Sequence, residues 1–135
     1  MSFQVLTTER VEINGVDISS SCTSAGIEVK ANEIDSTTFG TGWETKLGGL
    51  KSFGLKFEAN TDYAAGQLDA MLWPLLGTVV SMKIRPTSAA ISTSNPEYQG
   101  SVLVSGLTPV TGKVGDLATT SGTWPGSGAL VRATA

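Results

Sequence analysis

The residues that could perform catalysis are few in this sequence, and one type is missing. The chain contains no histidine, which excludes a Ser–His–Asp triad and a Cys–His nucleophile and removes the commonest general base. Glu33 and Asp35 stand two residues apart, so on a strand they would share a face as the paired carboxylates that glycoside hydrolysis needs. No second motif supports that chemistry, and the exposed end of a strand is the simpler interpretation.

Two further chemical signals are equally weak. Residues 112–116, "GKVGD", contain the glycine and lysine of a phosphate loop without its G-x-x-x-x-G-K-[ST] spacing, which favours a turn that enters a strand. Cys22 is the single cysteine, so an intrachain disulfide is impossible and a buried or idle thiol is expected. We therefore predict a protein without catalytic activity, cofactor or metal site.

Three tryptophans could form an aromatic platform for a sugar. Trp73 stands in an apolar run, which predicts a core position. Trp43 and Trp124 lie in glycine-rich segments with few neighbours to pack against. For these two, an anchor in a protein interface and core packing beneath a loop both remain open.

Composition indicates a single β-rich domain over residues 1–135. Hydrophobic residues make up 40% of the chain, enough for a core, whereas charged residues are only 16%, below the usual ~25%. The net charge of −3 and the pI of about 4.8 argue against a surface that grips nucleic acid. The first residues do not resemble a signal peptide, and no stretch has the ~18 apolar residues of a membrane helix, so we expect folding in a cytosol without membrane insertion.

The first half of the chain predicts strands. Residues 11–18 read "VEINGVDI", and Asn14-Gly15 between alternating runs predicts a type I′ hairpin. Residues 19–26 are expected to form a loop, 27–31 a short strand, and 36–49 a long segment without periodicity. Residues 51–59 alternate with period two, which places one set of side chains inside: Phe53, Leu55, Phe57 and Ala59.

The second half predicts one helix and more strands. Residues 60–77 carry the apolar spacing of a helix, with a cap among residues 60–62 and an end near Pro74. Strands are expected over 78–86, over 98–107 and in two final segments, 113–124 and 127–135, with these side chains inside: Val80, Met82, Ile84, Val102 and Val104. The prediction is a mainly β fold of seven or eight strands with one helix.

Several segments together resemble the tail tube (major tail) proteins of long-tailed phages and gene transfer agents. They are "DSTTFG" at 35–40, "GGLKSFGLKFEAN" at 48–60 and "GKVGDLATTSGTWPGSGALVRAT" at 112–134, in that order around one helix. The resemblance implies a β-sandwich or part-barrel flanked by a helix, as in the tube protein of type VI secretion. It also implies a structural virion protein assembled in the host bacterial cytoplasm. Copies would form rings, usually of six, whose strands join into one inner barrel, and the rings would stack into a hollow tube that passes DNA.

The same resemblance implies two sets of site residues. Residues 35–50 are the candidate inter-ring loop, with Phe39 and Trp43 as anchors; its members are Asp35, Thr38, Phe39, Gly40, Trp43 and Leu50. The candidate inner-barrel strands contain Lys51, Phe53, Leu55, Lys56, Phe57, Glu58, Val80, Met82, Lys83 and Arg85. A loop that folds back over its own sheet is the alternative for the first set.

Charge and partners follow from this reading. Six chains of −3 carry −18 per ring, and an acidic or neutral polar wall would let DNA pass without specific binding. Lys56, Lys83 and Arg85 depart from an acidic wall, and pairing with acidic residues of the next subunit is one interpretation. The implied partners are further copies of the chain, a tape-measure protein and tail-tip or terminator proteins. The alternatives are a capsid-decoration or head–tail joining protein and a carbohydrate-binding β-sandwich.

Overall fold

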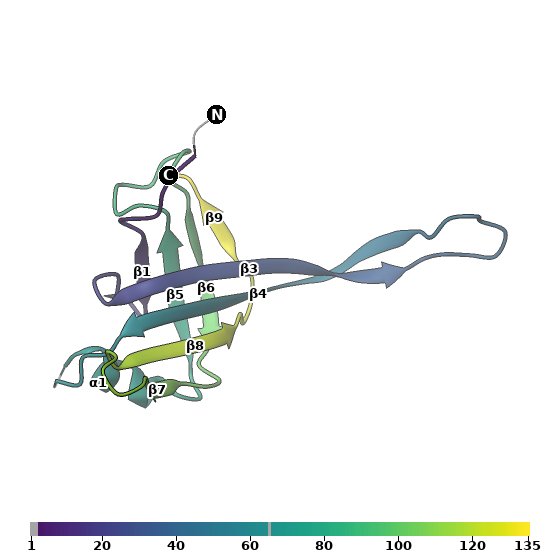
Figure 1. The fold of residues 1–135 in the computed structure, drawn as a ribbon. Helices are drawn as coiled ribbons and strands as arrows, with labels where there is room; N and C mark the ends of the chain where they lie inside the picture. Colours follow the sequence, from purple (N-terminus) through teal and green to yellow (C-terminus); the bar gives the residue numbers. More distant parts are fainter. Residues whose placement is uncertain (1–2, 65) are drawn as a thin grey trace.

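The computed structural model describes residues 3–64 and 66–135, which form nine strands, one short α-helix and one 3-10 turn. One antiparallel sheet has the order β2-β1-β5-β6-β9 and the other the order β3-β4-β8-β7. The strands of the two sheets cross face to face in Figure 1. The bounds are β1 Arg10–Ile13, β2 Val16–Asp17, β3 Cys22–Asp35, β4 Lys46–Asn60, β5 Val79–Arg85, β6 Glu97–Leu103, β7 Thr108–Thr111, β8 Thr119–Pro125 and β9 Val131–Ala133. This arrangement confirms the predicted mainly β sandwich.

The predicted first hairpin is present. β1 and β2 pair through Ile13 and Val16, and the turn residues Asn14 and Gly15 both have positive φ, at 54° and 79°. A type I′ turn requires this backbone conformation at both central positions. The hairpin buries Val11 and Ile13 against the core.

The core lies between the two sheets. All nine residues predicted to point inward are buried, namely Phe53, Leu55, Phe57, Ala59, Val80, Met82, Ile84, Val102 and Val104. Trp124 of β8 is fully buried among them and packs edge-to-face on Phe57, with ring centroids 4.9 Å apart. Its indole Nε1 donates a hydrogen bond of 2.6 Å to the carbonyl of Gly106. The interface-anchor interpretation of Trp124 is therefore wrong.

The helix is much shorter than predicted. Helix α1 spans Leu68–Leu72 and continues as the 3-10 turn η1 over Trp73–Leu75, while Ala65 of the predicted range lies outside the described residues. Thr61 donates its backbone N–H to Ala118, and Tyr63 donates its hydroxyl to Pro109. These bonds commit the segment before the helix to the β7–β8 hairpin, so it does not wind into a helix. No helix of residues 3–64 and 66–135 is long and apolar enough to cross a membrane.

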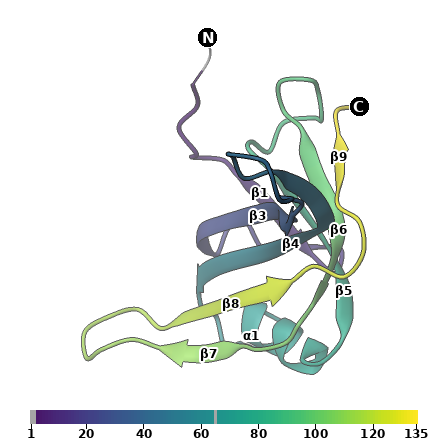
Figure 2. The ribbon, with the colours of Figure 1, turned by 90° about the vertical axis from the view of Figure 1, so that its right-hand side faces the viewer.

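Trp73 lies outside the core, contrary to the prediction. Helix α1 sits at one end of the sandwich (Figure 2) and buries Leu68 and Leu72 there. Trp73 follows directly in the chain and is 61% exposed. Hydropathy alone placed it inside, but the two leucines already occupy the inner side of this short helix.

Both long central strands extend into segments predicted as loops. β3 begins at Cys22, inside the expected loop 19–26, and β4 begins at Lys46, inside the aperiodic segment 36–49. β7 was not predicted, and β8 begins only at Thr119, so the count is nine strands within the described residues rather than seven or eight. The glycines of these segments disfavour strands locally, but each pairs with a partner, Gly26 with Lys56 and Gly48 with Glu33.

Arg85 has its acidic partner within its own chain. Its Nε lies 3.3 Å from Oε2 of Glu97, which is 4% exposed, and Gln99 donates a hydrogen bond of 2.8 Å to the same carboxylate. On the neighbouring strands Arg10 pairs with Glu12 and Asp17. Pairing of Arg85 with the next subunit, considered above, is therefore replaced by an internal ion pair.

Replacement of Trp124 by alanine should destabilise the chain by about 3–5 kcal/mol, because a large buried ring and its hydrogen bond are both lost. Trp73→Ala is the matched control and should change the stability of the isolated subunit by less than about 1 kcal/mol, since the side chain is mostly exposed. Urea unfolding followed by circular dichroism measures both. Equal losses for the two variants would contradict the assigned core.

Candidate assembly surfaces

Residues 30–52 form an arm that projects far beyond the sandwich (Figure 1). The β3–β4 pairing continues along it without a break in direction, from Lys30 opposite Ser52 to Asp35 opposite Lys46. Apart from the half-buried Ser36 and Gly49, all its residues are exposed. The arm is thus held mainly by backbone hydrogen bonds between its two strands, and nothing among the described residues covers its sides.

The arm keeps the two faces of the sheet from which it grows. Side chains directly opposite in an antiparallel pair share a face. Val29, opposite Phe53, ends the core-facing row at the root of the arm. The register shift between Ala31 and Glu33 places its extra residue in β4, so β3 keeps its alternation and the opposed pair Ile34 and Leu47 lies on the other face. These three side chains are 54%, 51% and 61% exposed. Large apolar side chains are therefore bare on both faces of the arm.

The tip of the arm is held by hydroxyl groups. Asp35 accepts a 2.9 Å hydrogen bond from the backbone of Thr37, and its bonds from this residue lower the pKa of its carboxyl group. Ser36 donates its N–H to the carbonyl of Thr45, while Thr45 donates its N–H to the hydroxyl of Thr37. The polar residues of "DSTTFGTGWET" thus tie the two strands together where the sheet ladder ends.

Beyond these bonds the tip presents two aromatic rings. Thr41 donates its hydroxyl to the carbonyl of Thr38, and Gly40 between them has a φ of 90°, which a glycine adopts without strain. Phe39 and Trp43 are 107% and 87% exposed. Folding back over the chain's own sheet is therefore wrong for this segment. The loop itself is shorter than predicted, because Leu50, 82% exposed, lies within β4.

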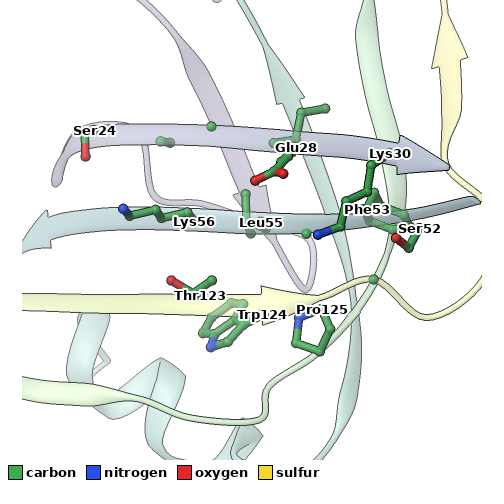
Figure 3. A pocket seen from close by; sticks show the side chains of 15 residues that line it. Ser24, Glu28, Lys30, Ser52, Phe53, Leu55, Lys56, Thr123, Trp124 and Pro125 are labelled. Carbon is green, nitrogen blue, oxygen red and sulfur yellow. The ribbon is translucent and has the colours of Figure 1, made fainter. Parts of the chain in front are cut away.

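The solvent-facing side of the four-stranded sheet is polar and hollowed. A groove of about 730 Å³ runs across β3, β4 and β8 (Figure 3). Two of its lining residues have no side chain, so the backbone is accessible there. They are Gly26, opposite Lys56, and Gly54, which lies between Glu28 and Pro125. We call this side the polar face; its side chains include Ser24, Glu28, Lys30, Ser52, Lys56, Glu58, Ser121, Thr123 and Pro125.

The polar face carries no excess of charge. Its acidic residues are Glu28 and Glu58 and its basic residues are Lys30 and Lys56, which cancel. The net −3 of the chain therefore resides on other surfaces. A face of serine, threonine and glycine whose charges cancel offers little net attraction to a phosphate backbone.

The candidate inner-barrel residues fall in two different sheets. Lys56 and Glu58 lie on the polar face, Lys51 lies on the arm, and Phe53, Leu55 and Phe57 belong to the core. Val80, Met82, Lys83 and Arg85 belong to β5, in the other sheet. The structure therefore does not bring the β4 and β5 residues onto one surface, and of the two strands β4 alone contributes to the polar face.

The other residues considered for sugar, phosphate or metal binding do not come together in one site. Trp43 at the arm tip and Trp73 beside α1 lie at opposite ends of the molecule, and Trp124 is buried, so no platform of three rings exists. Residues 112–116 form the turn between β7 and β8, where Lys113 donates its N–H to Asp116. Within residues 3–64 and 66–135, no three residues of the types His, Cys, Asp and Glu group as metal ligands.

The four-stranded sheet ends in two strands that lack an outer neighbour among the described residues. β3 exposes its outer edge over 14 residues, whereas β7 at the other end has four and includes Pro109. A long free edge is a template for another strand. The five-stranded sheet differs, because its edge strands β2 and β9 have only two and three residues.

Comparison with solved structures finds several similar chains, among them two that align over nearly the whole chain. One is a chain of the virion of a native gene transfer agent particle, with a TM-score of 0.74, 14% identity, and coverage of 97% of this chain and 99% of that one. The other comes from the tail of an empty gene transfer agent particle with C6 symmetry, with a TM-score of 0.70, 16% identity, and coverage of 93% and 94%. The chain has the fold of gene transfer agent particle proteins.

The agreement is one of fold and not of sequence. No protein family and no curated protein matches the sequence. Both matches cover nearly all of the matched chain. Neither of those two chains therefore carries a large domain outside the shared fold. The mainly β fold implied by the resemblance to tail tube proteins is thereby confirmed.

Cys22 stands at the start of β3 and is half-buried. Burial, together with the negative charges of Glu9 and Asp17, raises the pKa of its thiol to about 11. The thiol is consequently protonated and inert at neutral pH.

Alkylation of Cys22 at pH 8 should be roughly 100-fold slower in the folded protein than in denaturant, because the thiolate fraction falls tenfold for each unit of pKa above the free value. The rate should then rise about tenfold per pH unit up to pH 10. Iodoacetamide labelling followed by mass spectrometry measures it, with the urea-unfolded chain as control. A folded-state rate equal to the unfolded rate would show that the thiol is open to solvent.

Proposed function

We propose that this chain is a tail tube subunit: copies associate into rings of six, and the rings stack into a hollow tube that conducts DNA. The observation that carries the proposal is the match over 93% of the chain to a protein in a C6-symmetric gene transfer agent tail. The chain's own surfaces support it in two directions, around the ring and along the tube.

Around the ring, the four-stranded sheets join edge to edge. The free edge of β3 in one copy pairs with β7 at the opposite edge of the next copy, a head-to-tail contact that closes when the rotation closes. Joining covers β7 and a stretch of β3 of about the same length, and so shortens the free edge, which otherwise favours aggregation. The polar face then lines the lumen, since the opposite side of the sheet is filled by the core.

The neutral polar face suits a conduit. Binding of DNA comes mainly from lysine and arginine contacts that release counterions. On the polar face Lys30 and Lys56 are offset by Glu28 and Glu58, so DNA passes without a net attractive or repulsive wall. Of the acidic and neutral polar walls considered above, this face corresponds to the neutral one. A tape-measure protein inside the tube and tip or terminator proteins at its ends complete the assembly, which forms in the host bacterial cytoplasm and resides in the virion tail.

Along the tube, the arm links one ring to the next. Its paired part beyond Lys30 extends for about 20 Å at the usual rise per residue, and its apolar pair Ile34 and Leu47 and its two aromatic rings are bare. A capsid-decoration or head–tail joining protein would use the same fold without stacking, so it remains the second candidate. A sugar-binding role is no longer supported, because the three tryptophans do not form one platform.

Electron microscopy of the purified chain at rising concentration should show six-fold rings and hollow tubes. Trp43→Ala should shift the product from tubes toward rings or subunits, because an exposed aromatic anchor is removed. Trp43→Phe is the conservative control and should retain tubes. If polymerisation needs a starting complex, tail tips are added as seeds.

Two outcomes count against the proposal. Trimers or isolated rings formed by the unaltered chain, even with seeds, would favour the decoration or joining role. Tubes of unchanged abundance and thermal stability in Trp43→Ala would remove the arm tip from the inter-ring contact.

A further inference from the structure

We propose that the arm of one copy docks on an apolar patch beside α1 of a copy in the adjacent ring. The patch, here called the α1 patch, consists of Trp73, Leu76 and Val79, which are 61%, 45% and 55% exposed. This inference rests on the proposed tube, and it names the surface that receives the arm.

The α1 patch is compact. Leu76 donates its N–H to the carbonyl of Trp73, and Thr78 donates to Leu75, so two successive turns fold these seven residues together. Gly77 between them has a φ of 83° and reverses the chain before β5. Val79 then opens β5 opposite Leu103. Three large apolar side chains are thereby held outward on a short, hydrogen-bonded segment.

The core does not need these side chains. α1 already buries Leu68 at 6% exposure and Leu72 at 0%. The three exposed residues are therefore additional to a filled core, and exposed apolar groups that gather in one place mark interaction sites.

The place of the patch suits the arm. In Figure 1 the arm leaves the sandwich on one side, and α1 lies at the end of the sandwich away from the arm tip. Identical rings that stack in one direction bring the projecting part of each copy to the opposite end of the next. The neighbouring β7–β8 hairpin also exposes Val110, Val114 and Leu117, but it belongs to the sheet edge that closes the ring.

The chemistry of the two surfaces agrees through apolar contact and not through charge. Phe and Trp bury ~150–250 Å² each, so Phe39 and Trp43 together supply roughly 300–500 Å² of the ~800 Å² per partner of a standard interface. The acidic Glu44 next to Trp43 pairs with Lys46 at 4.0 Å, so the arm tip brings little net charge toward Asp69, one helical turn before Trp73. The contact should therefore persist at high salt.

Cysteine cross-linking tests the contact directly. In a Cys22→Ala background, the pair Glu44→Cys and Ala70→Cys, which are exposed neighbours of Trp43 and Trp73, is placed in one chain, assembled, and oxidised with copper phenanthroline. Because each copy contributes its arm to one neighbour and its patch to another, a denaturing gel without reductant should show a ladder of covalent multimers. The matched control pair is Glu44→Cys with Val16→Cys, an exposed residue of β2, which should give no ladder.

A second variant makes the test independent of the introduced cysteines. Trp73→Ala should yield rings that do not stack, Trp73→Phe should restore tubes, and the tube yield of the unaltered chain should not fall with sodium chloride. Tubes without a ladder, or tubes of unchanged stability in Trp73→Ala, would overturn the α1 patch as receiver and leave the tube proposal standing. Absence of rings and tubes in the unaltered chain, with seeds present, would overturn both.

Discussion

The pairing of β3 with β4 is the constraint on which the rest of the structure depends. One ladder runs from Cys22 opposite Ala59 to Asp35 opposite Lys46, through the body and out along the arm. Because the side-chain period of a strand is two, this register assigns every residue to one of two faces. The register shift at Ala31 and Glu33 lies where the body gives way to the arm.

The two ends of this ladder differ in whether other elements pack against them. In the body, the five-stranded sheet and α1 cover one face, and Phe53, Leu55 and Phe57 become core. On the arm, nothing among the described residues packs over the pair Ile34 and Leu47. The same hairpin is thus a stable part of a domain at one end and an incomplete structure at the other. An isolated two-stranded hairpin is marginally stable in water, so a partner that covers the arm would also stabilise it.

The low content of charged residues is explained by the two surfaces on which serine and threonine are found. At the arm tip their hydroxyls close the loop between Asp35 and Thr45. On the polar face they give a hydrated wall together with balanced lysines and glutamates. The buried ion pair of Arg85 and Glu97 belongs to neither surface and links β5 to β6 within the five-stranded sheet.

The sequence by itself determined the elements whose signals are local. Asn14-Gly15 specified its hairpin because few residues accept positive φ in succession. The alternation over residues 51–59 specified a buried and a wet face, and the missing histidine excluded the usual catalytic groups. A resemblance spread over the whole chain was enough to predict the fold.

Tertiary structure decided everything that depends on what lies opposite a residue. Gly26 and Gly48 became strand residues through their partners, against their own propensity. Trp124 was buried and Trp73 exposed, although hydropathy suggested the reverse for Trp73, because the inner side of α1 was already filled by leucines. The division of β4 and β5 between two sheets, and the extension of an apparent loop into an arm, follow from long-range pairing, which no local pattern of residues encodes.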